Sequence, residues 1–279
     1  MAPVAPANMA SAALAVEANL FAFFHHVASW PRVELHDEPD CCWTLSELPF
    51  PLFNSVMRAR RPDDRIDALI DARIADCEAR QVAMLWWTGP STSPADLGAR
   101  LDRHGFFLEA ALGMAADLEH GTAGAAIAAD AMTSVEAVED PATLATWSRV
   151  LCESFGAPQP FGDAFAELAA SIGLGARSPF RHFLARVNGE PAATSSLFLG
   201  AGVAGIYDVA TLPERRRRGL GRLVTQAAMR EARALGYRLA ILHSSDLGAG
   251  IYRSLGFRDV CAIGQHVWTP HSLQSRVGS

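Results

Sequence analysis

Between an apolar segment (203–211) and an amphipathic one (219–236), the chain reads Val209-Ala210-Thr211-Leu212-Pro213-Glu214-Arg215-Arg216-Arg217-Arg218-Gly219-Leu220-Gly221-Arg222. The apolar segment predicts a buried strand, and the helical spacing of hydrophobic residues after it predicts a helix with one buried face. The first N–H groups of a helix have no intrahelical acceptors and lie at the positive end of its dipole. Glycines there let a pyrophosphate approach the backbone. The stretch therefore predicts an anion cradle at a strand-to-helix junction.

This arrangement differs from two common phosphate-binding motifs. A Walker loop needs Gly-Lys-Ser/Thr, and a Rossmann fingerprint needs three glycines with an acid farther along the chain. Taken alone, the four arginines at 215–218 are also typical of a solvated charge run or a small nucleic-acid patch. Their position directly before Gly-x-Gly at the predicted junction favours the cradle.

A second motif follows the first, after a predicted strand at 239–243 and before two predicted closing strands within 258–268. It reads Ser244-Ser245-Asp246-Leu247-Gly248-Ala249-Gly250-Ile251-Tyr252-Arg253-Ser254-Leu255-Gly256-Phe257. Together the two motifs resemble the GNAT superfamily of acetyltransferases. Arg216, Gly219 and Gly221 fill the positions of its acyl-CoA loop, Gln/Arg-x-x-Gly-x-Gly/Ala. The tail Ile-Tyr-x-x-x-Gly-Phe is similar to the family's Leu-Tyr-x-x-x-Gly-Phe, but Ser245 and Gly248 stand where the family often has Asn and Ala.

The resemblance implies that acetyl-CoA is the acyl-donor co-substrate and that no metal takes part. In the family, the strand before the loop is splayed from its neighbour, and its backbone pairs with the pantetheine arm and the thioester carbonyl. The N–H groups of the loop hold the pyrophosphate, and a hydroxyl at 245 can reach the cofactor. The cofactor-binding residues so implied are Val209, Ala210, Thr211, Arg216, Arg217, Arg218, Gly219, Leu220, Gly221, Arg222 and Ser245.

Two catalytic residues follow from the same resemblance. In the family, the tyrosine at the position of Tyr252 points at the thioester sulfur. A phenol of pKa about 10 can protonate a departing thiolate whose thiol has a pKa of about 8.5. The attacking amine must lose a proton, and the candidate bases are Asp208, just before the cofactor strand, and His243. Without the motif, Tyr252 is typical of helix packing, Asp208 of a structural acid, and His243 of a core or edge histidine.

Composition excludes several classes of protein. A net charge of −6 over 279 residues argues against a protein that coats nucleic acid or a membrane, and no lysine occurs. The five cysteines show no C-x-x-C or Cys/His ligand spacing, so we expect neither a disulfide framework nor a metal site, and a reducing cytoplasm fits. The apolar stretch at 9–30 has helical spacing and no Lys or Arg before Arg32, which indicates an amphipathic helix and not a membrane span.

The N-terminal half resembles the C-terminal half. A strand-like segment at 83–87 and a helical one at 94–104 precede Gly105-Phe106, as 239–243 and 249–255 precede Gly256-Phe257. Leu101 then stands at the position of Tyr252, and the corresponding loop, 57–66, has no glycine. We therefore expect a degenerate GNAT-like domain at 1–122, an alanine-rich linker at 123–131, and a catalytic GNAT domain at 132–279. The expected fold class is α/β, with two mixed, mainly antiparallel twisted sheets flanked by helices.

These features favour an N-acetyltransferase whose acceptor is a small-molecule or peptide amine. Nucleic acid and membranes are not expected partners, and the chain is expected to be a monomer or a homodimer. Two alternatives stay open: a non-catalytic acyl-CoA-binding sensor or interaction protein, and an RNA- or DNA-binding module that uses the arginines at 215–218. The second predicts an affinity that falls steeply with salt.

Overall fold

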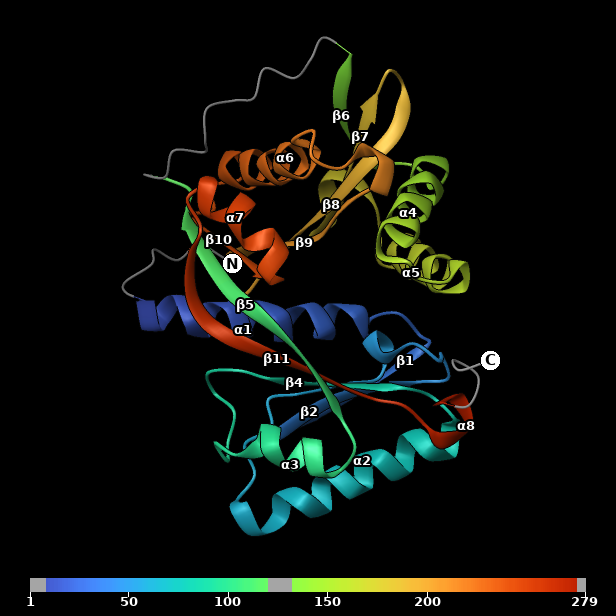
Figure 1. The fold of residues 1–279 in the computed structure, drawn as a ribbon, viewed down its shortest axis with the longest axis vertical. Helices are drawn as coiled ribbons and strands as arrows, with labels where there is room; N and C mark the ends of the chain where they lie inside the picture. Colours follow the sequence, from blue (N-terminus) through green and yellow to red (C-terminus); the bar gives the residue numbers. More distant parts are fainter. Residues whose placement is uncertain (1–8, 120–131, 275–279) are drawn as a thin grey trace. The chain divides into compact units, whose positions relative to one another are not determined.

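The computed structural model describes residues 9–119 and 132–274, which divide into two compact units (Figure 1). Unit 1 comprises Met1–Phe23 and Gly113–Val260, and unit 2 comprises Phe24–Leu112 and Cys261–Ser279. The predicted α/β class, with a mixed sheet flanked by helices, is confirmed. No helix among the described residues is long and apolar enough to cross a membrane.

The division into units differs from the sequential one that we predicted at 1–122 and 132–279. Three elements contribute residues to both units: α1 (Met9–Val27), β5 (Phe107–Asp117) and β11 (Arg258–Trp268). Each of them is a long, continuous element, so nothing in its local sequence marks a boundary. The predicted linker at 123–131 lies outside the described residues.

Unit 1 holds a mixed sheet in which four strands run antiparallel in the order β6-β7-β8-β9, and β10 joins parallel to β9. The turn between β7 and β8 is Asn188-Gly189, with φ of 56° and 81°, as a tight hairpin turn requires. The strand bounds are β6 (Thr133–Ala137), β7 (Phe180–Val187), β8 (Glu190–Gly200), β9 (Val203–Thr211) and β10 (Leu239–Ser244).

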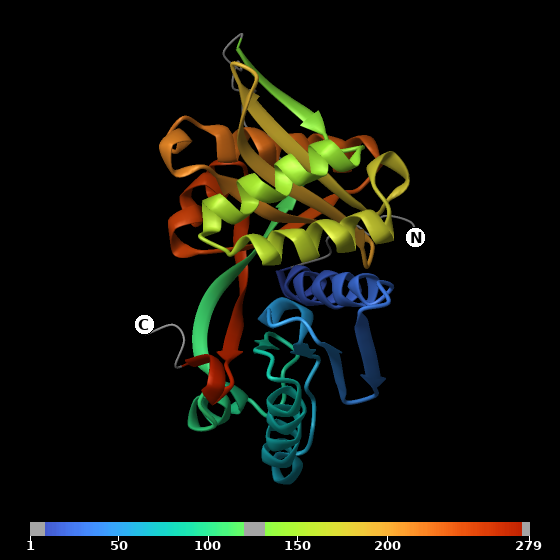
Figure 2. The ribbon, with the colours of Figure 1, turned by 90° about the vertical axis from the view of Figure 1, so that its right-hand side faces the viewer.

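Helices cover both faces of this sheet, with α4 and α5 in front and α6 behind in Figure 2. Adjacent serines of β8 show the alternation: Ser195 donates to a carbonyl of α6, whereas Ser196 lies beside His182 on the face covered by α4. Asp140 caps α4 by accepting from the N–H groups of residues 142 and 143. The helices are α4 (Pro141–Phe155), α5 (Gln159–Ile172), α6 (Leu220–Ala234) and α7 (Asp246–Ser254), with 3₁₀ turns at Gly175–Arg177 and Pro213–Arg215.

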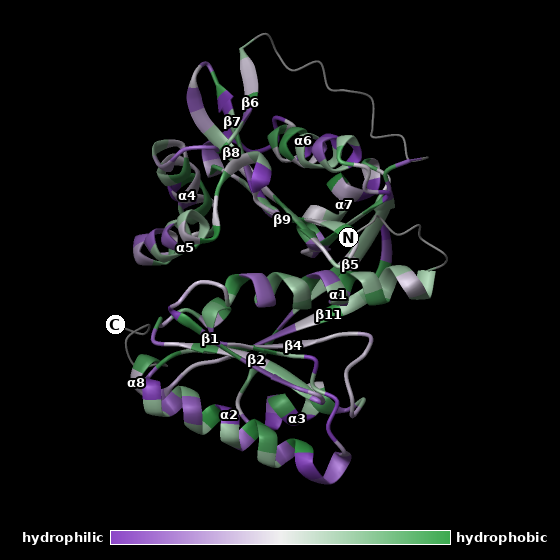
Figure 3. Ribbon diagram, turned by 180° about the vertical axis from the view of Figure 1, so that it is seen from behind, coloured by the Kyte–Doolittle hydropathy of each residue, from purple (hydrophilic) through white to green (hydrophobic). Residues whose placement is uncertain are grey.

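Helix α1 supplies part of the core of unit 1. Its buried Asn19 donates to the carbonyls of Gly200 (2.9 Å) and Val203 (3.3 Å) and accepts from the Tyr207 hydroxyl (2.7 Å). Phe23 packs against the aromatic rings of β7, β8 and β9. Figure 3 shows hydrophobic residues along most of α1 and a mixture of hydrophobic and hydrophilic residues along α6. A buried amide that satisfies two carbonyls fixes the position of α1 on the sheet.

Unit 2 repeats this plan with other residues. Strands β1, β2 and β3 are antiparallel, β4 is parallel to β3, and β11 is antiparallel to β4. Trp86, Ile70 and Phe106 form part of its core. The elements are β1 (Val33–Glu38), β2 (Cys41–Ser46), β3 (Ser55–Met57), β4 (Met84–Thr88), α2 (Ile66–Arg80), α3 (Leu97–Arg103) and α8 (His271–Gln274), with 3₁₀ turns at Pro51–Phe53 and Asp63–Arg65.

The repeat that the sequence suggested has the same backbone hydrogen bonds in both halves. The N–H of Phe106 donates to the carbonyl of Leu101 (3.0 Å), and the N–H of Phe257 donates to the carbonyl of Tyr252 (3.1 Å). The intervening glycines both have a left-handed φ, 83° and 93°. Leu101 therefore occupies the position in unit 2 that Tyr252 occupies in unit 1.

Candidate acyl-CoA site

Strands β9 and β10 separate at the predicted cofactor segment. In the register of the described residues, their parallel pairing ends where Ile206 lies opposite Leu242, whereas β9 stays paired with β8 as far as Thr211. The backbone of 209–211 is thus hydrogen-bonded to β8 on one edge. Its other edge lies beyond the last residue pair that β9 forms with β10. Such an edge is open to the amide groups of an extended ligand.

A β-bulge lies at the start of this segment. Thr194 faces Ala210 and Ser196 faces Tyr207, so β9 has one residue more than β8 over this stretch. Asp208 belongs to the bulge and has a left-handed φ of 54°, and its carbonyl accepts from the Thr194 hydroxyl (2.9 Å). Because a bulge bends a strand and redirects its side chains, it explains why β9 departs from β10 here.

The loop after β9 leads into the N-terminus of α6. Arg217 and Gly219 have a left-handed φ, 61° and 77°, and alternation of this kind turns successive N–H groups toward one side. Gly219 precedes the first residue of α6, and its carbonyl accepts from the N–H of Leu223 (3.0 Å). The N–H groups at the start of the helix are therefore available to an anion.

The Arg216 side chain has a structural role in this loop. Its Nε donates to the carbonyl of Thr211 (3.2 Å), and its guanidinium donates to the carbonyl of Ser154 at the end of α4 (2.9 Å). These bonds fasten the loop to β9 and α4. The positive charge of Arg216 stays beside the helix N-terminus.

A pocket of about 930 Å³ opens at this place, and all its lining residues belong to unit 1. It brings together most of the predicted residues: Val209, Ala210, Thr211, Arg216, Arg217, Gly219, Leu220, Gly221, Arg222, Ser245 and Tyr252. Two predicted residues, Arg218 and Asp208, are not among those that line it. The remaining lining residues were not predicted from the sequence: Ser154, Phe155, Leu247, Gly248, Gly250, Ile251 and Ser254.

Three of these missed residues are hydrophobic and exposed, which is a signal of a ligand surface. Phe155 is 63% exposed, Leu247 97% and Ile251 44%, and they come from α4 and α7. Residues 247 and 251 lie one helical turn apart within the second motif, so their helical spacing was visible in the sequence. Phe155 lies 54 or more positions before the loop, and only the fold brings it to the pocket.

Tyr252 lines the pocket from α7 and is largely buried, with 9% of its surface exposed. Burial raises the pKa of its phenol to about 12. The phenol therefore keeps its proton throughout the neutral range. It is in the correct protonation state to donate a hydrogen bond or a proton.

Asp208 belongs to a chain of polar groups on the face covered by α4. Burial raises the pKa of its carboxyl to about 6, although a hydrogen bond from Ser196 opposes the shift. The Ser196 hydroxyl also lies 2.8 Å from Nδ1 of His182, and burial lowers the pKa of that imidazole to about 3. Because Ser196 donates to the carboxylate, the neutral imidazole must donate from Nδ1 to Ser196. Asp208 is thus held at the end of a directed hydrogen-bond chain.

His243, the other candidate base, is placed differently. It lies on β10 and is not among the pocket-lining residues, and its ring lies 5.9 Å from that of Tyr207. Burial lowers the pKa of its imidazole to about 4. These features are typical of a core histidine.

In unit 2, acidic groups occupy the position that corresponds to the cradle. Asp63 and Asp64 directly precede α2, and Asp67 lies in its first turn. The guanidinium of Arg100 is already paired with the carboxylates of Asp63, Asp67 and Asp96. Negative side chains already compensate the dipole of α2, so they repel a phosphate.

The comparisons with known proteins agree with this geometry. The model of the Acetyltransferase (GNAT) family matches residues 144–257. A comparison with curated proteins found no match. Among solved structures, a GCN5-related N-acetyltransferase from Kribbella flavida has a TM-score of 0.70 at 18% identity, covering 92% of this chain and 98% of its own.

Two further structures are similar over nearly the whole chain. A GCN5-related N-acetyltransferase from Sphaerobacter thermophilus has a TM-score of 0.61 at 16% identity, covering 96% of this chain and 94% of its own. A tandem GNAT protein from the clavulanic acid biosynthesis pathway has a TM-score of 0.60 at 15% identity, covering 96% of this chain and 97% of its own. Residues 144–257 therefore match the GNAT acetyltransferase family model, and the fold of the chain is similar to that of GNAT acetyltransferases, a tandem GNAT protein among them.

Proposed function

We propose that the protein is an acyl-CoA-dependent N-acyltransferase that moves an acetyl group from acetyl-CoA to an amine in a ternary complex. One observation carries the proposal: a single pocket is lined both by the N-terminus of α6 and by the phenol of Tyr252. A helix N-terminus suits a pyrophosphate, and a protonated phenol suits a departing thiolate. Both parts of an acyl-CoA are thereby recognised in one cavity.

Different residues of the pocket would contact different parts of acetyl-CoA. The N–H groups of 217–222 and the guanidinium groups of Arg217 and Arg222 would hold the pyrophosphate. The exposed apolar side chains of Phe155, Leu247 and Ile251 would contact the pantetheine and the adenine. The open backbone edge of 209–211 would pair with the pantetheine amides and orient the thioester carbonyl.

The proton balance assigns roles to Asp208 and Tyr252. The amine attacks the thioester carbonyl, a C–N bond forms, and the C–S bond breaks. Because Asp208 does not line the pocket, the proton that the amine loses would reach it through a water, and its raised pKa of about 6 lies close to neutral pH. Tyr252 donates its proton to the sulfur as the thiolate leaves. Ser196 and His182 orient the Asp208 carboxylate.

Unit 2 takes no cofactor in this proposal. Leu101 in place of a tyrosine and the acids at the start of α2 support a degenerate GNAT-like domain in the N-terminal half. The acceptor is a small-molecule or peptide amine, and the working form is a monomer or homodimer. Five free cysteines in the described residues suit the reducing cytoplasm.

Thermal unfolding with and without acetyl-CoA tests the cofactor site. A ligand at one hundred times its dissociation constant stabilises a protein by about 2.7 kcal/mol. In Gly221→Glu, the new side chain points toward Val209 and Thr211, which both line the pocket. It fills the cavity and adds a negative charge, yet it needs no left-handed φ and suits the first turn of a helix. Arg230→Glu, on the exposed face of α6 and outside the pocket lining, is the control.

We expect acetyl-CoA to stabilise the wild type, Arg230→Glu and Tyr252→Phe, but not Gly221→Glu. Lack of stabilisation in the wild type refutes the cofactor site. Release of CoA is then measured with polyamine, aminoglycoside and peptide-amine acceptors. Binding of acetyl-CoA without CoA release from any acceptor contradicts the transferase and favours an acyl-CoA sensor.

A further inference from the structure

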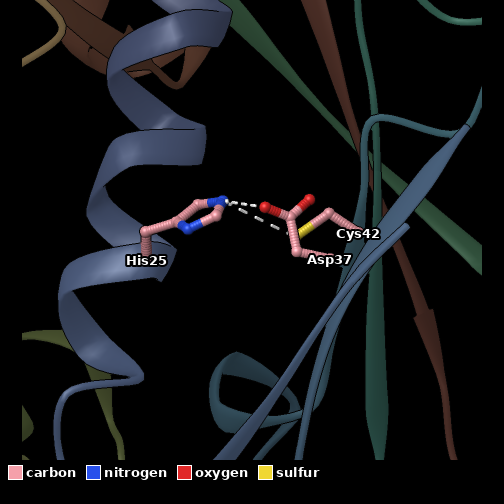
Figure 4. A group of neighbouring side chains, drawn as sticks. All are labelled: His25, Asp37 and Cys42. Atoms are coloured by element: carbon pink, nitrogen blue, oxygen red, sulfur yellow. Dashed lines mark hydrogen bonds and ion pairs between the residues drawn. The ribbon is translucent and has the colours of Figure 1, made fainter. Parts of the chain in front are cut away.

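Three side chains of unit 2 converge far along the chain from the acyl-CoA loop. His25 comes from the last turn of α1, Asp37 from β1 and Cys42 from β2 (Figure 4). Nε2 of His25 lies 3.5 Å from Oδ2 of Asp37 and 3.9 Å from Sγ of Cys42. One atom from each residue lies within 4.8 Å of the other two.

The strand register brings two of the three together. Asp37 and Cys42 are direct cross-strand partners in the β1–β2 hairpin, so their side chains lie on the same face. The helix then adds His25 on that face. The cluster therefore depends on hairpin register and helix position, and the separations of 12 and 5 residues in the sequence resemble no familiar metal motif.

The geometry is that of a ligand set and not that of a catalytic triad. In a triad, the carboxylate and the nucleophile bond to different nitrogens of the imidazole. Here both approach Nε2, and a neutral imidazole cannot satisfy two partners at one nitrogen. Metal bonds of about 2.0–2.3 Å at tetrahedral angles place N and O about 3.4 Å apart and N and S about 3.5 Å apart. The observed N–O and N–S distances of 3.5 and 3.9 Å need shifts of only a few tenths of an ångström, and the O–S pair lies within 4.8 Å.

The surroundings of Asp37 also suit a metal ligand. Arg58 binds the other carboxylate oxygen, Oδ1, and leaves Oδ2 directed at His25. An outer hydrogen bond of this kind orients a ligating carboxylate. A divalent cation would balance the charges of one thiolate and one carboxylate.

We propose that His25, Asp37 and Cys42 bind one divalent cation of the zinc type. A thiolate and an imidazole favour zinc and related transition metals over magnesium and calcium. The side chains of His25 and Asp37 are each 40% exposed, so a water can complete the coordination. The cation fastens the last turn of α1 to the β1–β2 hairpin. It takes no part in acyl transfer.

Cobalt(II) is the probe, because thiolate ligation gives it a charge-transfer absorption and tetrahedral geometry gives it intense visible bands. The full chain is prepared without a histidine tag, stripped with a chelator, and titrated with cobalt and then with zinc. The ligand variants are Cys42→Ser, His25→Gln and Asp37→Asn. The matched controls are His36→Gln, a neighbouring exposed histidine of β1, and Cys261→Ser, a more exposed thiol.

We expect the wild type and both controls to bind one equivalent with the thiolate band, which zinc then displaces. Cys42→Ser loses the band, and His25→Gln and Asp37→Asn each bind at least tenfold more weakly. If Cys42→Ser does not fold, the two exposed positions still decide the result. Absence of the band in the wild type, or unchanged affinity in both His25→Gln and Asp37→Asn, overturns the proposal.

Discussion

Replacing Asp208 by asparagine should make the protein more stable and less active. Burial raises the pKa of this carboxyl from 3.8 to about 6. Because the pKa is higher in the folded state by about two units, the ionised carboxylate lowers the free energy of unfolding by roughly 3 kcal/mol. Asparagine has the same shape and no charge, and its oxygen still accepts from Ser196. Asp208→Asn should therefore gain up to about 3 kcal/mol at pH 8.

The gain depends on pH in a direction that follows from the raised pKa. Between pH 4 and 6, the folded wild type holds a proton that the unfolded chain has lost. Its free energy of unfolding therefore falls as the pH rises through this window, and the contribution of the protonated carboxyl is lost above pH 6. Below pH 4 both states are protonated, so wild type and variant should have similar stability. The difference should open between pH 4 and 6 and stay constant above.

The activity of the same variant should change in the opposite direction. If Asp208 is the general base, its loss should reduce kcat/KM by roughly 10²- to 10⁴-fold. In the wild type, log kcat/KM should rise with a slope of one up to about pH 6 and then level off, because the base must be ionised. This rise of log kcat/KM below pH 6 should disappear in Asp208→Asn.

Chemical denaturation and steady-state kinetics at pH 4 to 8 check both effects. Asp163→Asn, an exposed acid of α5, is the control and should change neither stability nor the pH profile. Equal or lower stability of Asp208→Asn at pH 8 would refute the assigned pKa. Unchanged kcat/KM at pH 8 would refute the role as base, whatever the stability.

Four further substitutions have definite expected outcomes. Tyr252→Phe should lower kcat by roughly 10²-fold with little change in KM for acetyl-CoA, since only the proton donor is lost. Gly219→Ala should lose about 1 kcal/mol in denaturation experiments because its φ is 77°, whereas Gly221→Ala should gain a few tenths, because its Cβ meets only atoms at 3.7 Å or more. Asn19→Ala should lower the free energy of unfolding by about 2–3 kcal/mol, because three buried partners lose their hydrogen bonds.

The sequence predicted the part of the fold whose motifs are local. The Arg-x-x-Gly-x-Gly run and the Ile-Tyr-x-x-x-Gly-Phe tail each combine a turn with a helix terminus. Interactions between residues adjacent in the sequence therefore determine the structure of both. The Asn188-Gly189 turn is equally local, because both of its residues adopt the left-handed φ that a tight hairpin turn requires. The structure also brings most predicted cofactor residues to one pocket, although their roles stay predictions.

Other features depend on contacts distant in sequence. We predicted two closing strands within 258–268, and this was wrong: one strand, Arg258–Trp268, runs through the segment, and its residues from Gly264 to Trp268 pair with β4. The strands between Val33 and Met57 and strand β5 were missed: β2 and β5 do not alternate regularly between polar and apolar residues, and β1 alternates only over residues 33–36. The bulge at Asp208 and the cluster at Cys42 are visible only once strands are in register.

Because α1, β5 and β11 each contribute to both units, no single cut in the gene yields either unit complete. A fragment that starts at residue 132 keeps the pocket residues but loses Asn19 and Phe23. The carbonyls of Gly200 and Val203 would then lose their amide donor. The aromatic rings that pack against Phe23 would be exposed to water, which favours aggregation. A chain with this interlaced plan is a poor donor for domain shuffling, and its two halves are constrained to evolve as one piece.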